Sequence, residues 1–174
     1  LARCGDRLAQ DGAALIALHR QLTGAARGRI ADPMRLAREL AWLDGVAGGL
    51  RPRDRLRLDS ALLSAQAAGE GIDRDSAARL IQRLADLRED LPAEVVETAL
   101  HAAAAAREAL DSEHAELLIA PWQRTEAVGC GGRMLFIRLA EERARLAAAT
   151  GRWKDARKHL DRAEEAAARL ADAQ

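Results

Sequence analysis

The apolar residues of this chain recur at helical spacing between strong breaks. Leu36, Leu40 and Leu43 are three or four residues apart, which places them on one stripe of a helix. Proline and glycine mark where such segments begin and end, for example at Pro33 and at Pro52. The pattern predicts about seven helices, which begin near residues 5, 33, 52, 73, 92, 125 and 153.

Some of these helices carry more specific expectations. Asp73 or Asp75 should cap the fourth helix, since an aspartate oxygen can accept hydrogen bonds from the first turn. A single fifth helix should run from Pro92 through Leu117, because its apolar positions continue that far. The first, sixth and seventh helices should cover about 5–23, 125–149 and 153–172.

Composition supports an all-α fold. Hydrophobic residues make up 49% of the chain and are mostly alanine and leucine, which favour helices, whereas aromatic residues make up only 2%. The regular spacing of the helix starts suits antiparallel helices joined by short turns. We expect a helical bundle or a short stack of helical hairpins in one domain, 1–174, with 1–120 and 121–174 as a finer division.

The 27 basic and 27 acidic residues cancel overall but are unevenly placed. Residues 1–58 hold 11 basic and 6 acidic residues, residues 59–131 hold 6 and 14, and residues 132–174 hold 10 and 7. The basic ends either lie against the acidic middle of the same chain or bind another copy head to tail, which would give a homo-oligomer. A chain without net positive charge is not typical of a nucleic-acid-binding protein.

Cys4 and Cys130 are the two cysteines, and neither has the spacing of a zinc site. They are interpreted as buried free thiols, with a single bridge between them as the alternative. No run of about 18 apolar residues could span a membrane. A cytoplasmic location is favoured, although a chain that begins with Leu1 leaves processing or export open.

Candidate chemical groups are few, and they form no recognisable catalytic set. Glu97, His101 and Glu108 share the polar side of the fifth helix, and His114 borders its apolar stripe. They are weak candidates for metal ligands, because a metal site needs three or four converging ligands and no second helix supplies them. A solvated helix face explains them as well. No phosphate loop, activated nucleophile or cofactor motif is present, so the sequence predicts no cofactor and does not indicate an enzyme.

Two kinds of residue could contact a partner. Four arginines alternate around the helix start near residue 52, where positive charge opposes the helix dipole. They could bind an acidic partner or a phosphate, or pair with the acidic middle of the same chain, residues 59–131. Tryptophan is enriched in binding hot spots but is also common in protein cores. The candidates are Arg51, Arg53, Arg55, Arg57, Trp42, Trp122 and Trp153.

The segment Leu139–Ala166 has the pattern of a closely packed helical hairpin. Gly151 allows the positive φ that ends a helix, and Trp153 should plug the turn. Small residues leave room for close approach of the two helices, with Leu160 filling the gap between them. The small residues are Ala144, Ala147, Ala156 and Ala163.

This pattern is similar to one unit of a tetratricopeptide repeat, which has small residues, a glycine and then an aromatic, and a large apolar residue at these places. The chain departs from the family at Arg143, where a large apolar residue is preferred, and in lacking a helix-ending proline after Ala163. The resemblance covers about a sixth of the chain and implies a scaffold that binds peptides or partner proteins. An ordinary pair of packed helices is the alternative.

These features predict a protein–protein interaction module, meaning a scaffold, adaptor or regulatory domain that binds another protein or a peptide in a helical groove. The absence of a converging catalytic set from the sequence favours a binding role over an enzymatic one. The alternative is a sensor domain that holds a small ligand between helices, near Trp122, Cys130 and Phe136.

Overall fold

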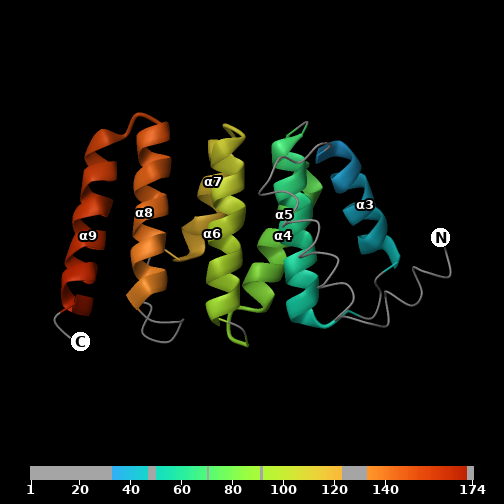
Figure 1. Cartoon of the computed structure of the whole chain (residues 1–174), viewed down its shortest axis with the longest axis horizontal. Helices are drawn as coiled ribbons and strands as arrows, with labels where there is room; N and C mark the ends of the chain where they lie inside the picture. Colours follow the sequence, from blue (N-terminus) through green and yellow to red (C-terminus); the bar gives the residue numbers. More distant parts are fainter. Residues whose placement is uncertain (1–32, 47–49, 70, 91, 123–132, 172–174) are drawn as a thin grey trace. The chain divides into compact units, whose positions relative to one another are not determined.

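The computed structural model describes residues 33–46, 50–69, 71–90, 92–122 and 133–171, and most of these residues are helical (Figure 1). No strand occurs in this part of the chain, which confirms the all-α prediction. The elements are α3 (Pro33–Val46), α4 (Pro52–Ala68), α5 (Arg74–Asp86), α6 (Pro92–Glu108), α7 (Ser112–Ile119), the 3-10 turn η1 (Ala120–Trp122), α8 (Arg133–Ala149) and α9 (Trp153–Ala171).

The described residues thus contain seven α-helices, although they are not the seven that the sequence predicts. The predicted helix over 5–23 lies outside the described residues, as do Cys4, Cys130 and the first part of the predicted sixth helix. The predicted fifth helix is divided into α6 and α7. None of the helices in the described ranges is long and apolar enough to cross a membrane.

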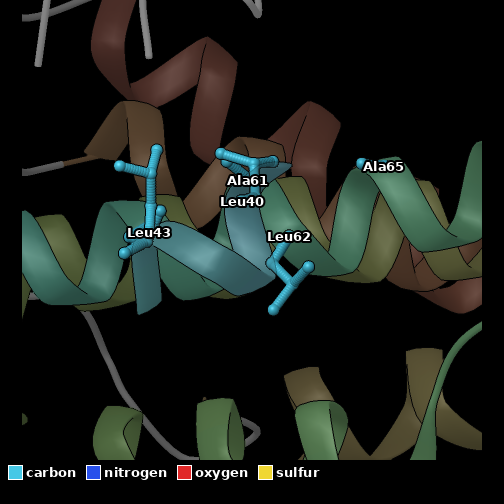
Figure 2. Packing of buried hydrophobic residues seen from close by; sticks show 6 residues of the cluster. Leu40, Leu43, Ala61, Leu62 and Ala65 are labelled. Atoms are coloured by element: carbon cyan, nitrogen blue, oxygen red, sulfur yellow. The ribbon is translucent and has the colours of Figure 1, made fainter. Parts of the chain in front are cut away.

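Contacts between residues divide the chain into two compact units, Leu1–Arg83 and Leu84–Gln174. In the first unit, one cluster of buried residues lies between α3 and α4. Figure 2 shows leucines of α3 beside leucine and alanine side chains of α4. Burying each leucine contributes about 1.5–3 kcal/mol, and the alanines allow the two helices to approach closely. The cluster consists of Leu40, Leu43, Leu58, Ala61, Leu62 and Ala65.

Polar contacts fix the helices of the first unit to one another. The guanidinium of Arg55 binds Asp44 at 3.0 Å and joins α4 to the end of α3. Arg83 of α5 binds the buried carboxylate of Asp59 on α4. Burial raises the pKa of Asp59, and the charge of Arg83 opposes that rise.

Asp73, rather than Asp75, caps α5. Its carboxylate accepts hydrogen bonds from the backbone N–H of Ser76 at 2.9 Å and from the hydroxyl of Ser76 at 2.8 Å. These bonds to the charged form lower the pKa of Asp73. Gln66 of α4 also donates to the Ser76 hydroxyl at 3.2 Å, so the cap is tied to the preceding helix.

In the second unit, a left-handed residue ends α6, so the prediction of one helix from Pro92 through Leu117 is wrong. Leu110 has a φ of 61°. The N–H of Asp111 donates to the carbonyl of Ala106 at 2.9 Å, and the N–H of Leu110 donates to Arg107 at 3.0 Å. These bonds satisfy the last carbonyls of α6. The Asp111 carboxylate then accepts from the His114 N–H at 3.1 Å and starts α7.

α8 and α9 form an antiparallel hairpin, and α8 also packs against α6 and α7 (Figure 1). As predicted, the small residues Ala144, Ala147, Ala156 and Ala163 are buried. The other two predictions for the hairpin are wrong, because Trp153 is 70% exposed and Leu160 is 45% exposed. Small alanines, together with Ile137 of α8, fill the space between the helices, and Trp153 and Leu160 lie outside it.

Candidate binding pocket

A pocket of about 340 Å³ opens in the second unit between α7, α8 and α9. Six of its eleven lining residues are ionisable, and the others are apolar. The volume lies at the lower end of the range for ligand pockets, which is about 300–1,000 Å³. The pocket can therefore hold one side chain, one chain end or one small molecule.

Helical spacing explains how α8 and α9 form two of its walls. Leu146 and Ala147 follow Arg143 on α8 by three and four residues, so both lie on its side of the helix. On α9, the same spacing joins Asp155, His159 and Arg162. The third wall comes from α7 and η1 and consists of Glu116, Leu117, Ile119 and Ala120.

The turn between α8 and α9 fixes these walls. Gly151 has a φ of 73°, which glycine adopts without strain. The N–H of Arg152 donates to the carbonyl of Ala147 at 2.8 Å, and the N–H of Gly151 donates to Ala148 at 3.0 Å. This is a Schellman motif, and it confirms the predicted role of Gly151. Thr150 strengthens the turn by donating its hydroxyl to the carbonyls of the last turn of α8.

An ion pair at the rim of the pocket connects α7 to the turn between α8 and α9. The guanidinium of Arg152 binds the carboxylate of Glu116 on α7 and also donates to the Thr150 hydroxyl at 2.9 Å. Both side chains of the pair are about half exposed, so the ion pair contributes little stability. Its main consequence is that the charges of Arg152 and Glu116 neutralise each other.

Arg143 lacks such a partner. Its Nη2 makes one long contact, 3.5 Å, with the carbonyl oxygen of Ile119, and its buried Nε has no acceptor among the described residues. No carboxylate in the described ranges lies within 4 Å of its guanidinium. Burial, together with the nearby positive charge of Arg162, lowers the pKa of Arg143 to about 10. Arg143 stays charged at neutral pH, because that pKa is still well above 7.

His159 faces the same pocket and is also incompletely paired. Its Nδ1 is buried and has no hydrogen-bond partner in the described part of the chain. Burial lowers the pKa of His159, and so do the positive charges of Arg143 and Arg162. Asp155 opposes these effects, and Lys158 adds to them weakly. The imidazole is therefore largely neutral at pH 7.

The arginines near residue 52 have different surroundings. Arg51 and Arg53 are exposed at the start of α4, and Arg57 is half-buried. Arg55 pairs with Asp44, which belongs to the basic segment 1–58 and not to the acidic middle of the chain. The arrangement leaves the binding of an acidic partner by this set as a prediction.

The three tryptophans differ in exposure. Trp42 is 42% exposed on α3, and Trp153 is 70% exposed at the start of α9. Trp122 is only 1% exposed, and the guanidinium of Arg88 lies 5.0 Å from the centre of its ring. Trp122 is therefore a core residue, while Trp42 and Trp153 are accessible to a partner.

The candidate metal ligands are occupied by other contacts. Arg138 of α8 lies 3.8 Å from Glu97 and 3.4 Å from His101 on α6. His114 binds the Asp111 carboxylate through Nδ1 at 2.7 Å, as part of the start of α7. Glu108 lies 3.8 Å from the neighbouring Arg107. In the described ranges, no three His, Cys, Asp or Glu residues gather closely enough to hold a metal ion.

The sequence did not locate this pocket. The ligand site was expected near Trp122, Cys130 and Phe136, but none of these residues lines the pocket. Trp122 is buried and Phe136 is half-buried, while Cys130 lies outside the described residues. One sequence signal did point to the pocket, because Arg143 stands where the resembling family prefers a large apolar residue.

Compared with protein-family models, with curated proteins and with solved structures, the chain matches none.

Proposed function

We propose that this chain is a protein–protein interaction module, a scaffold or adaptor, and that it binds a short segment of its partner at the pocket between α7, α8 and α9. The proposal rests on one observation, the open pocket of about 340 Å³ whose walls come from three helices. Its size suits one anchoring side chain or chain end of a partner whose remaining residues lie on the surrounding surface.

We also propose that α8 and α9 are a unit of the tetratricopeptide type. The left-handed Gly151 and the buried alanines of the hairpin support this assignment. The exposed Trp153 and Leu160 differ from the pattern, and Arg143 replaces an apolar side chain by a charged one. On this proposal the hairpin supplies the frame, and Arg143 makes one of its inner positions a binding position.

The lining of the pocket favours a partner segment over a small molecule held between helices. Small-molecule sites enclose most of the ligand. This pocket is open, and more than half of its lining residues are ionisable. A charged group at the end of a longer segment fits such a lining better than an apolar compound does.

Peptide selection tests the proposed function. The full chain would be used to select binders from a displayed library of random peptides, and the dissociation constants of the selected peptides would be measured by fluorescence anisotropy. Leu117 lines the pocket and is 49% exposed, so Leu117→Ser should weaken binding by about fivefold or more through lost apolar contact.

Met134 provides the matched control for Leu117. It is 54% exposed on α8 and does not line the pocket, so Met134→Ser should leave the affinity unchanged. Peptides that bind equally well to both variants and to the original chain would place the binding surface elsewhere. A library that yields no binder, together with a small molecule that raises the melting temperature, would favour the sensor alternative.

A further inference from the structure

We propose that the pocket between α7, α8 and α9 is a carboxylate site in which Arg143 and Arg162 bind the carboxylate of the partner segment. This inference rests on the proposed function and adds the chemistry of the group that is recognised. The carboxylate has two sources in a peptide, its C-terminus and an acidic side chain, and both present the same two oxygens.

The first argument comes from the unmet hydrogen bonds of Arg143. Its guanidinium is partly removed from water, its Nε has no acceptor in the described part of the chain, and its one carbonyl contact is 3.5 Å long. A buried donor without an acceptor is costly, and a guanidinium presents its donors in a planar fork that matches a carboxylate. An incoming carboxylate would satisfy donors that the described residues leave unsatisfied.

The second argument is the balance of charge. Arg152 and Glu116 pair with each other at the rim. The remaining lining groups are Arg143, Arg162, Asp155 and the neutral His159, which leaves one positive charge in excess. One monoanion therefore neutralises the pocket at pH 7. A phosphate dianion would need a second positive charge from the lining, which protonation of His159 would supply.

The third argument is the combination of charged and apolar walls. Leu117, Leu146 and Ala147 line the pocket beside the charged groups. They can contact the carbon atoms next to a carboxylate while the arginines bind its oxygens. Low-dielectric walls also strengthen the attraction between the arginines and the bound anion.

Titration with simple anions tests the chemistry directly. In NMR spectra of the isotopically labelled full chain, sodium acetate should shift the Nε–H signal of Arg143 and the ring signals of His159 and should saturate. Sodium chloride at equal ionic strength should not. Shifts that never saturate, or that chloride reproduces, would overturn the carboxylate site. Saturation by phosphate at a lower concentration than acetate would overturn the choice of carboxylate over phosphate.

Three arginine variants separate the pocket from the general charge of the helix. Arg143→Met should abolish the saturable response of His159, and Arg162→Gln should weaken acetate binding by about tenfold. Arg157→Gln is the matched control, because Arg157 lies on α9, pairs with Asp161 and does not line the pocket. An equal loss in Arg157→Gln would show that the effect is nonspecific and would overturn the inference.

The selected peptides then identify the source of the carboxylate. Amidation of the C-terminus should weaken binding by about 10- to 100-fold if the chain end is bound, and Glu→Gln or Asp→Asn changes should do so if a side chain is bound. Peptides that bind at the pocket but tolerate both changes would overturn the carboxylate inference and leave the proposed function standing. Saturable acetate binding without any peptide binder would overturn the proposed function and leave the carboxylate site standing.

Discussion

Glu142 and Arg143 are consecutive residues of α8, but Glu142 has charged partners whereas Arg143 has none among the described residues. The buried carboxylate of Glu142 accepts a hydrogen bond from Arg107 of α6 at 2.7 Å and another from Arg145 at 3.4 Å. Arg143 has no carboxylate partner among the described residues and lines the pocket. Glu142 therefore stabilises the packing of α6 against α8, whereas the charge of Arg143 stays available for a ligand.

Removing the charge of Glu142 should destabilise the second unit. Glu142→Gln keeps the shape of the side chain but removes the buried charge that pairs with half-buried Arg107, so the free energy of unfolding should fall by about 1–3 kcal/mol. Urea denaturation followed by circular dichroism measures this. The control is Glu141→Gln, which disrupts only an exposed pair with Arg145 and should change stability by less than about 0.5 kcal/mol. Equal effects of the two changes would contradict the structural role of Glu142.

Arg143→Met should separate stability from binding. Methionine places an apolar side chain where the resembling family prefers one, and it removes a charge that is partly desolvated. The free energy of unfolding should therefore rise by about 1 kcal/mol, and the melting temperature should rise with it. The same change should abolish acetate binding. Calorimetry and the NMR titration together check both parts. A variant that is less stable than the original chain would indicate that Arg143 has a structural partner.

Leu110 carries backbone strain that glycine would relieve. Its side chain is 89% exposed and its φ is 61°, so Leu110→Gly loses little burial and removes a left-handed conformation that costs a non-glycine residue about 1–2 kcal/mol. Glycine also has a larger entropy cost on folding, so the net gain should be about 0.5–1 kcal/mol. Leu110→Ala keeps the strain and should give no comparable gain. Denaturation midpoints of the three proteins measure the difference.

The helices could be predicted from the sequence because their signals are local. Pro33, Pro52 and Pro92 begin helices where expected, and Gly151 ends one. The break at Leu110 could not be predicted from periodicity, because leucine rarely adopts a positive φ and the apolar pattern continues past it. The Asp111-Ser112-Glu113 run, which starts α7, is the only local signal there.

The pocket could not be predicted in the same way, because its walls come from three helices. The spacing of Asp155, His159 and Arg162 shows only that they share a face of α9. Whether that face meets Arg143 depends on how α8 and α9 pack, which the buried alanines determine. Tertiary packing also decides that Leu160 is exposed while Ala156 and Ala163 are covered.

His159 should make stability and binding depend on pH in opposite directions. Because its pKa is lowered in the folded protein, the unfolded chain binds more protons below about pH 6.5, and the folded state loses stability as the pH falls through that range. His159→Gln should remove this part of the pH dependence, measured as the difference between two sets of denaturation curves from about pH 7 to pH 5.

A bound carboxylate offsets the charges of Arg143 and Arg162, so saturating acetate should raise the pKa of His159 in an NMR titration. By linkage, acetate should then bind more tightly as the pH falls from about 7 toward 6, and His159→Gln should bind it equally across that range. A His159 pKa that acetate leaves unchanged would contradict the placement of the carboxylate beside this side chain.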